Sequence, residues 1–277
     1  MKNPTAPHFR WIRYCLHLTG LTFGLSLSHA ASYDCLIEPS QSLEIGSPVT
    51  GVVDKVWVKR GDRVKKGQIV FTLESNAEAA AADLAKFKSQ AIGAIKSAQN
   101  KVAFGQTKYE RRKEMAAENL VSKQERDDAE AEWRLAEAEL VAAKESKDQA
   151  ALEYKQQSSL LALRTVRSTI DGVVVDQMLY PGETAEAGSK KPVLKLAQLD
   201  PLKVRVMLPM SVFGKVKAGS VAEVSTEYSP SERLKDTVRH TDKVLDAASG
   251  THIIFLDLPN KTLEIPAGTK CKASIDL

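Results

Sequence analysis

The side chains of this 277-residue sequence that could perform covalent chemistry are few and far apart. After the first thirty residues only two histidines remain, His240 and His252, and no nucleophile motif accompanies either. Hydrolases need a nucleophile and a base within hydrogen-bond reach. Two scattered histidines, two distant cysteines and no carboxylate cluster at ligand spacing also fail to compose a metal site. The sequence therefore predicts no enzyme, no metal centre and no cofactor.

The first thirty residues differ from the rest of the chain. Lys2, Arg10 and Arg13 precede an apolar run from Cys15 to Leu27, and Ser28-His29-Ala30 then offers a small-x-small cleavage pattern. The run is about 13 residues, shorter than the ~20 that a membrane helix needs. Residues 1–30 are therefore predicted to be a secretory signal peptide cleaved after Ala30, with an uncleaved anchor as the alternative.

Export changes both the charge and the redox environment of the chain. The formal net charge of +4 includes three basic residues of the leader, so the exported chain carries 36 basic against 35 acidic residues. A near-neutral protein offers no electrostatic reason to bind nucleic acid. Because exported proteins meet oxidising conditions, Cys35 and Cys271 are a candidate disulfide, and two buried free thiols are the alternative.

The elements that position these side chains begin with a repeated β pattern. Two stretches about 120 residues apart carry short β-branched runs that end in glycine turns; they are 47–53, 61–64 and 69–73 in the first half, and 168–174, 182–185 and 193–196 in the second. Gly51 and Gly61 are ten residues apart, as are Gly172 and Gly182. This repetition predicts two similar sheets that fold face to face. Residues 31–75 and 163–200 are therefore assigned to one split β-module.

A long helical region separates the two halves. From Ser75 to about Leu163 there is no proline, and the only glycines are Gly93 and Gly105. Small and bulky residues recur at spacings of three and four along Leu84, Ala91, Ala98, Gly105 with Ile95, Val102, Tyr109, Ala116, and along Ala129, Ala136, Ala143, Ala150 with Trp133, Leu140, Lys147, Tyr154, Leu161. Such a pattern is typical of a closely packed coiled-coil seam. Residues 76–162 are therefore predicted to form an α-helical coiled-coil hairpin.

The hairpin needs a turn, and residues 118–122 supply one. Ser122 begins a capping box with Glu125, as Ser75 does with Glu78. Each arm then has about 40 residues and reaches roughly 60 Å at 1.5 Å per residue. A single long helix is the rival interpretation, but it would keep the two β halves apart.

The remaining residues, 201–277, favour a small antiparallel β-barrel. Alternating strands at 204–208, 221–226, 253–258 and 271–275 are separated by turns such as Ala248-Ser249-Gly250 and Pro266-Ala267-Gly268. The run from Ala31 to Leu43 is expected to pass along this barrel, which would bring Cys35 near Cys271. The predicted fold class is thus mixed α and β, elongated and built from three modules.

A lipoyl or biotin carrier is an alternative function for the split β-module. Such carriers present a modified lysine on the tight turn between the halves. Here residues 73–77 occupy that place, and Ala77 stands where the acceptor lysine would be expected. The chain therefore has no obvious attachment point for an acyl or carboxyl group.

Taken in order, the three modules resemble the periplasmic adaptors, or membrane-fusion proteins, of tripartite efflux and secretion systems. The resemblance covers nearly all of the exported chain. Its most specific elements are Gly51-Val52-Val53, the run from Gly61 to Gln68, Gly172-Val173-Val174, the intervening helices and the barrel segment from Val244 to Thr251. The order of these elements is more specific than any one of them.

The resemblance implies a docking site at the hairpin tip. Adaptors often carry an Arg, a Leu four residues on and a Ser seven beyond, which contact an outer-membrane duct; Arg111, Met115 and Ser122 have this spacing. Met in place of Leu should preserve an apolar contact. Without the resemblance, Arg111 is interpreted as a solvated charge, Met115 as a seam residue and Ser122 as a helix cap.

The resemblance also implies the partners and the location. They are an inner-membrane transporter, an outer-membrane channel and further copies of the chain in a ring of about six, in the periplasm beside the inner membrane. A resistance-nodulation-division pump is the favoured transporter, an ATP-driven exporter the alternative, and a structural coiled-coil protein without a transport role a third hypothesis. The chain is expected to lack the membrane-proximal domain of many adaptors. The cargo is not encoded in any residue pattern.

Overall fold

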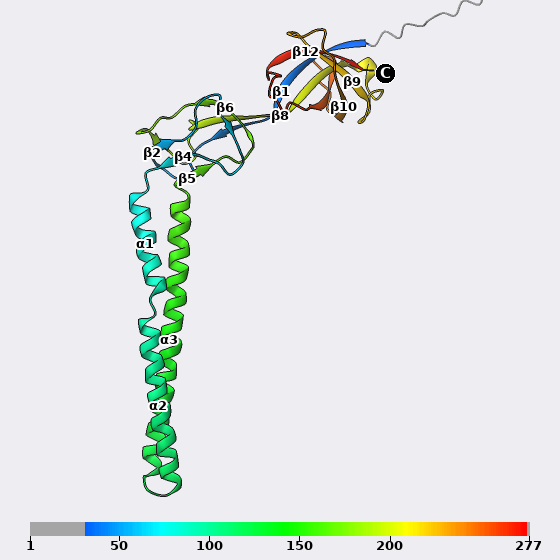
Figure 1. The fold of residues 1–277 in the computed structure, drawn as a ribbon. Helices are drawn as coiled ribbons and strands as arrows, with labels where there is room; N and C mark the ends of the chain where they lie inside the picture. The colour runs from blue at the N-terminus through cyan, green and yellow to red at the C-terminus, as the bar shows by residue number, and fades with distance from the viewer. Residues whose placement is uncertain (1–30, 276–277) are drawn as a thin grey trace, which may run out of the picture.

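A computed structural model describes residues 31–275; the predicted signal peptide at residues 1–30 lies outside the described residues. The molecule is elongated, with a β-barrel at one end, a second β-module beside it and a helical hairpin that extends away from that module (Figure 1). Among the described residues, no helix is both long and apolar enough to cross a membrane. The mixed α and β composition of the fold is confirmed.

Six antiparallel strands close the barrel. Their order is β1, β12, β9, β10, β11 and β8, and β8 pairs again with β1. The bounds are Ala31–Ile45 for β1, Leu194–Pro209 for β8, Val221–Thr226 for β9, Leu234–Thr241 for β10, Thr251–Leu258 for β11 and Thr269–Ile275 for β12; a short 3-10 helix, η1, covers Met210–Val212. Alternate side chains of β11, from His252 to Leu258, are buried in a core of Val, Leu and Ile side chains. Period-two alternation thus builds the barrel that the sequence predicted.

Strands β1 and β8 are long enough to belong to both β-modules. They pair Ile37 with Val204 in the barrel and Leu43 with Leu196 in the second module, with a register shift between Pro39 and Gln41. The predicted boundary after residue 200 therefore falls inside β8. A two-stranded ribbon, rather than a loose linker, connects the modules (Figure 1).

Polar contacts, those of Asn260 buried and that of Arg63 exposed, hold the ribbon and the second module to the barrel. The side chain of Asn260 is buried, and its Nδ2 donates to the carbonyl oxygens of Leu199 and Ile265, both at 3.0 Å. Its backbone N–H donates to Oδ1 of Asp200 at 2.8 Å. From the second module, Arg63 Nη2 donates to the carbonyl oxygen of Thr262 at 3.0 Å. A buried amide with its partners in place fixes local geometry.

The second module is built from both sequence halves. Its strands are β2 (Gly51–Val56), β3 (Arg63–Val64), β4 (Ile69–Leu73), β5 (Thr165–Arg167), β6 (Gly172–Gln177) and β7 (Thr184–Ala185). Strands of the first half pair with strands of the second, as β2 with β7, β3 with β6 and β4 with β5. Their apolar side chains, such as Val53 and Phe71, share a second core with Leu196 of β8. Neither half is complete without the other.

The hairpin consists of α1 (Asn76–Gln90) and α2 (Gly93–Ala117) packed along the single long helix α3 (Lys123–Ala162) (Figure 1). Small residues are buried between the arms, among them Ala98, Gly105, Ala129 and Ala136. A Cβ placed on Gly105 would lie 3.1 Å from the Cα of Trp133, so the arms approach closely there. The small residues along the seam permit this approach.

One expectation was wrong: the first arm is not one continuous helix. Ala91 is extended (φ −65°, ψ 128°), and the chain re-enters a helix at Gly93. In α1 the buried positions are Ala82 and Ala85. The heptad spacing of α2, extended back into α1, predicts that Leu84 is buried, one residue before Ala85, but the Leu84 side chain is 57% exposed. A continuous helix would turn the small face of α1 about 100° away from α3. The break corrects this mismatch.

The capping box predicted at Ser75 was also wrong. The hydroxyl of Ser75 makes no capping hydrogen bond. The carboxylate of Glu78 is instead paired with Arg164, which follows α3. This ion pair joins the bases of the two arms, a long-range contact that competes with the local cap.

Candidate functional site: the hairpin and its tip

A defined turn joins the two arms at the tip. The N–H of Leu120 donates to the carbonyl oxygen of Met115 at 2.8 Å, and that of Asn119 to Ala116 at 3.1 Å. Asn119 has a left-handed backbone (φ 57°), which asparagine tolerates better than most residues. These two bonds are those of a Schellman motif, so the turn is held by its backbone.

Ser122 caps α3, as the sequence predicted. Its Oγ accepts the N–H of Glu125 at 3.2 Å. The Glu125 carboxylate pairs with Arg112 Nη1 at 3.1 Å, which links the two arms. Beside them, the side chain of Arg126 hydrogen-bonds to the Asp127 carboxylate, and this contact raises the pKa of the Arg126 guanidinium above its usual value. The Ser122 hydroxyl is therefore already engaged within the turn.

Arg111 and Met115 line one groove of about 420 Å³ on the side of α2. The other lining residues are Phe104, Thr107, Lys108 and Arg112, so every charged side chain in it is a cation. Arg111 is exposed and takes part in none of the ion pairs found among residues 31–275, whereas Lys108 pairs with Glu132 and Arg112 with Glu125. Ser122 does not line this groove. The structure thus brings together two of the three predicted docking residues.

Two further residues of this region did not enter the sequence-based prediction. Phe104 lines the groove and is 68% exposed, and Leu120 is exposed in the turn. Phe104 immediately precedes the buried Gly105, and the heptad pattern places such a position outside the seam. A large apolar side chain at a non-seam position was the available signal.

Charged pairs form a ladder along one side of the hairpin. Basic residues of the first arm meet acidic residues of α3 in the pairs Lys88–Glu153 (3.9 Å), Lys101–Glu139 (2.7 Å), Lys108–Glu132 (2.5 Å) and Arg112–Glu125 (3.1 Å). Three of the acidic residues are seven apart. These positions flank the seam and fix the register of the two arms.

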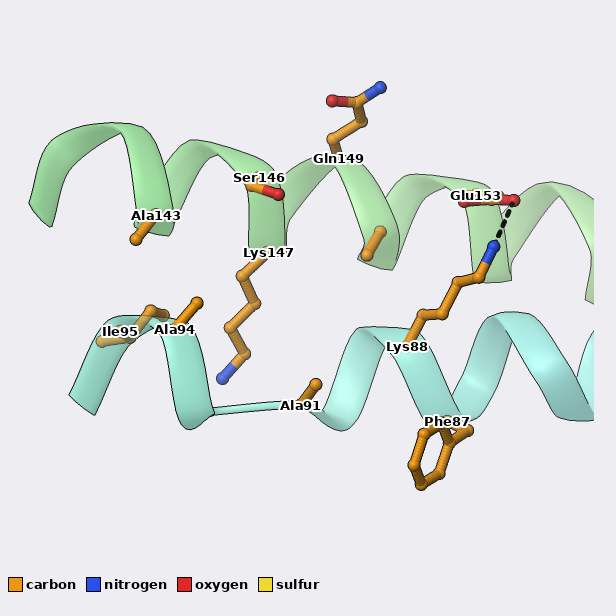
Figure 2. Close-up of a pocket in the computed structure, with 11 residues that line it drawn as sticks. Phe87, Lys88, Ala91, Ala94, Ile95, Ala143, Ser146, Lys147, Gln149 and Glu153 are labelled. Atoms are coloured by element: carbon orange, nitrogen blue, oxygen red, sulfur yellow. Dashed lines mark ion pairs between the residues drawn. The ribbon is translucent and has the colours of Figure 1, made fainter. Parts of the chain in front are cut away.

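The break in the first arm interrupts this ladder. A groove of about 460 Å³ opens there between α1, α2 and α3 (Figure 2). Lys147 extends from α3 toward the extended link at Ala91, while Lys88 reaches Glu153. A cation near the carbonyl end of α1 is electrostatically favourable. Lys147, an exception in the predicted seam, therefore lies where the seam is interrupted.

The two cysteines lie opposite each other on neighbouring strands. Cys35 of β1 pairs in register with Cys271 of β12, their Cα atoms are 4.9 Å apart and their sulfur atoms lie within bonding distance. The two cysteines are 236 residues apart in the sequence. A bond here would join the first and last strands of the barrel.

The histidines lie in different parts of the barrel. His252 is 1% exposed and lies edge-on to Phe213, with 5.2 Å between the ring centroids. Neither of its nitrogens has a hydrogen-bond partner among the described residues, and burial lowers the pKa of the imidazole. His240 stacks on Phe255. Ala77 lies in the first turn of α1, and no group of three potential metal-ligating side chains occurs within residues 31–275.

Comparisons with known proteins find a matching family model and several similar proteins whose names refer to export. Residues 41–197 match the family model of the CzcB-like, barrel-sandwich hybrid domain. The pyoverdine export membrane fusion protein PvdR of Pseudomonas putida is 23% identical over 205 residues, covering 73% of this chain and 52% of that protein. The multidrug export protein AcrE of Escherichia coli is 26% identical over 250 residues, covering 84% and 60%.

Solved structures show the same fold. The crystal structure of MacA from Actinobacillus actinomycetemcomitans aligns with a TM-score of 0.69 at 21% identity and covers 88% of this chain and 77% of that one. The membrane fusion protein Spr0693 from Streptococcus pneumoniae R6 aligns with a TM-score of 0.63 at 16% identity, covering 89% and 98%. The chain spans roughly half to three-fifths of the length of the two curated relatives above.

Proposed function

Because the chain belongs to the membrane fusion protein family, with a CzcB-like barrel-sandwich hybrid domain over residues 41–197, we propose that it is a periplasmic adaptor. In this role it links an inner-membrane transporter to an outer-membrane exit duct and forms part of a sealed conduit. It performs no covalent step; it holds two partners at a fixed distance. A resistance-nodulation-division pump is the transporter we propose, since a single hairpin of moderate length is typical of adaptors of that type.

The observation that supports this role is the separation of two different binding surfaces. The α3 helix has 40 residues, so the tip lies about 60 Å from the base of the hairpin. The groove at the tip has cationic and apolar lining residues, and the two β-modules lie at the opposite end (Figure 1). A stiff arm with a contact surface at each end can connect two partners without enclosing either.

The proposal includes the coiled-coil packing of the hairpin, because that packing keeps the two arms aligned. The arms contact each other through small residues, and the ion-pair ladder fixes their register. A ring of about six copies would place several tips on one duct. Weak contacts of single tips then add up, because each contact raises the effective concentration of the others.

Cargo selection is assigned to the transporter rather than to this chain. The names of two similar proteins refer to pyoverdine and to multidrug export, which are chemically unlike cargoes. The 420 Å³ groove at the tip is open and lies on the outside of a helix, where it does not enclose a small molecule. The chain is therefore proposed to build the conduit and not to recognise what passes through it.

In-cell photo-crosslinking tests both ends of the proposed bridge. A photoreactive residue at Asn119, exposed at the tip, is expected to capture an outer-membrane duct, and one at Lys217, exposed in the barrel, an inner-membrane transporter. Asn100, exposed midway along the arm, is the matched control and should capture neither. Mass spectrometry of the captured partners then identifies the transporter class. Capture of neither partner in cells that express the whole operon would favour the structural coiled-coil hypothesis.

Substitutions separate docking from helix stability at the tip. Arg111→Ala should abolish duct capture and export while leaving the helical circular dichroism unchanged, because Arg111 is exposed and forms no ion pair within residues 31–275. Lys96→Ala removes an exposed cation of the same helix outside the groove and should leave duct capture and export intact. Ser122→Asp retains a helix cap but removes the hydroxyl, so normal duct capture by this variant would assign Ser122 to stability alone.

A further inference from the structure

Two loops and the start of β1 lie together at the end of the barrel that is remote from the second module. Strand β1 begins there, at Ala31 (Figure 1). The loop after β8, residues 210–220, and the loop between β10 and β11, residues 242–250, meet at the same end, where the N–H of Met210 donates to the carbonyl oxygen of Gly250 at 3.1 Å. This surface, formed by the two loops, is called the outer barrel end below.

The first loop is fixed to the barrel core but leaves an aromatic ring in solvent. Val212 and Val216 are buried in the core. Between them in sequence, Phe213 is 45% exposed, and Lys215 and Lys217 are exposed as well. The loop therefore presents an apolar ring beside two cations, on a support that the buried valines hold in place.

The second loop repeats this combination. Val244 is 77% exposed, and its neighbour Lys243 is also exposed. The carboxylate of Asp246 serves the turn itself: hydrogen bonds from the side chain of Ser249 and from the backbone N–H groups of Ala248 and Ser249 lower its pKa below the usual value. The remaining exposed groups at the start of this loop are thus an apolar side chain and a cation.

The lysines of the two loops have no carboxylate partner. Lys215, Lys217 and Lys243 take part in none of the ion pairs found among residues 31–275. Their long stems can lie along an apolar surface while the ammonium groups reach an anion. Exposed apolar side chains flanked by cations suit the surface of a bilayer with anionic phospholipids, where apolar groups enter the headgroup region and cations stay with the phosphates.

The shape of the outer barrel end favours lipid over a protein partner. It consists of two loop ends rather than a flat face, whereas a stable protein interface usually buries about 800 Å² on each partner. A reversible lipid contact needs only a few apolar side chains and nearby cations. Large apolar groups that stay exposed on such a rigid support indicate a binding surface.

We propose that the outer barrel end contacts the lipid of the inner membrane directly. Phe213 and Val244 enter the headgroup region, and Lys215 and Lys243 bind phosphates of anionic phospholipids. The two loops lie on the bilayer and do not span it. This inference rests on the proposed function for the location at the inner membrane and goes beyond it, because the chain then holds lipid as well as the transporter.

The path of the chain agrees with this orientation. Residues 1–30, the predicted leader, join the described chain at Ala31, which lies at the outer barrel end. A contact at this end turns the second module and the hairpin away from the bilayer (Figure 1). The contact of one copy is weak, since even a whole myristoyl chain gives only marginal binding, and several copies beside one another would strengthen it.

Flotation with lipid vesicles tests the contact on the exported chain, residues 31–277. The chain is expected to float with vesicles of phosphatidylethanolamine and phosphatidylglycerol. Binding to vesicles of phosphatidylcholine alone should be about tenfold weaker, because the lysines then lose the anionic headgroups. Added salt should weaken binding to the anionic vesicles, since it screens the lysines from the phosphates.

Paired substitutions separate the apolar from the ionic contribution. Phe213→Ser with Val244→Ser should lower the partition coefficient about tenfold or more, because the exposed apolar area that enters the headgroup region is removed. Lys215→Gln with Lys243→Gln should lower it about fivefold or more, and only on anionic vesicles.

Matched controls make the same changes elsewhere. Phe87→Ser with Leu152→Ser removes two exposed apolar side chains of the hairpin. Lys261→Gln with Lys270→Gln removes two exposed lysines at the opposite end of the barrel. Both variants should bind vesicles as the wild type does. Unchanged circular dichroism and urea midpoints show that each variant is folded.

A tryptophan reports whether the second loop enters the bilayer. Residues 31–277 contain Trp57 and Trp133, so Trp57→Phe with Trp133→Phe gives a silent background. In that background the fluorescence of Val244→Trp should be quenched by phospholipids with brominated chains. Tyr228→Trp, exposed at the opposite end of the barrel, should not be quenched.

The outcomes separate this inference from the proposed function. Absence of vesicle binding, in a chain whose Lys217 probe still captures a transporter in cells, would overturn the lipid contact and leave the adaptor role standing. Binding that neither paired substitution weakens would also overturn it. A photoreactive residue at Val244 that captures the transporter, with no vesicle binding, would assign the surface to that protein instead. Vesicle binding with the expected losses, but without transporter capture at Lys217, would support the lipid contact and contradict the adaptor.

Discussion

Gly61 donates its backbone N–H to the carbonyl oxygen of Val174 at 2.9 Å, and Gly182 donates in the same way to Val53 at 2.8 Å. The two glycines hold equivalent places in the repeated sequence, with φ values of 91° and 90°. Each half of the module thus completes the turn of the other. The repeat that is visible in the sequence therefore corresponds, in the structure, to a symmetric pair of hydrogen bonds between the two halves.

These two turns should be sensitive to a side chain. Gly61→Ala or Gly182→Ala is expected to lower the free energy of unfolding of the module by about 1–2 kcal/mol, because an L-residue is strained at positive φ. The strain is conformational, since nothing lies within 4 Å of a Cβ at either position. Urea unfolding can be followed by the fluorescence of Trp57 in a Trp133→Phe background. Gly46→Ala, which has open space and no positive φ, should be neutral; an equal loss there would contradict this account.

The two arms are so close at Gly105 that a bulky side chain there should destabilise the hairpin. Gly105→Leu is expected to destabilise the hairpin by about 1–3 kcal/mol, since a Cβ would lie 3.1 Å from the Cα of Trp133 and overpacking forces the arms apart. Thermal melts recorded by helical circular dichroism measure the change. Gly93→Ala places a methyl group in open space at the start of α2 and should raise stability by up to about 1 kcal/mol. Similar effects of the two substitutions would rule out close packing as the cause.

The ion-pair ladder should set register more than stability. Glu132→Gln with Glu139→Gln is expected to lower hairpin stability by about 1 kcal/mol or less at low salt, because all these side chains are largely exposed. At 1 M NaCl the difference between wild type and variant should disappear, since exposed pairs are screened. Melts at the two salt concentrations test this. A loss that persists at high salt would show that the pairs act through packing.

His252 should make the barrel less stable in acid. Burial lowers the pKa of its imidazole from about 6.5, so the unfolded chain takes up a proton at a higher pH than the folded chain. Stability is then complete above about pH 7.5 and falls as the pH drops through 6.5, with a slope of at most about 1.4 kcal/mol per pH unit. Unfolding measured from pH 8 to pH 5 gives the slope. His252→Leu should remove this component, and His240→Leu should retain it.

The Cys35–Cys271 bond is predicted to contribute to barrel stability. Cys35→Ala with Cys271→Ala should lower the free energy of unfolding by about 2–5 kcal/mol, because the bond closes a loop of 236 residues in the unfolded chain. Urea unfolding with and without a reductant measures the effect, and reductant should change nothing in the double variant. Alkylation of the exported chain should find no free thiol before reduction. Free thiols in freshly isolated protein would contradict the pairing.

Local sequence patterns predicted most of the architecture. Glycine spacing identified the two module halves because Gly61 and Gly182 adopt a positive φ, and because a Cβ on Gly172 would lie 2.5 Å from the carbonyl oxygen of Ala197. Period-two alternation identified the barrel strands, and heptad spacing identified buried residues such as Ala98 and Ala129. Ser122 and its cap followed from neighbours within one turn. Each of these features depends on residues close together in sequence, and that information is present in the chain itself.

The sequence by itself determined which elements form and how the module repeats. Only the tertiary structure decided where the first arm breaks, because the register of α1 is set by the face that α3 covers, about 60 residues away. The tertiary structure also decided the partner of Glu78, which pairs with Arg164 instead of capping its own helix. It likewise decided the path of β1, which runs through two modules because it pairs with β8 in both of them. Long-range packing energies outweigh local propensities at these positions, and no local pattern records them.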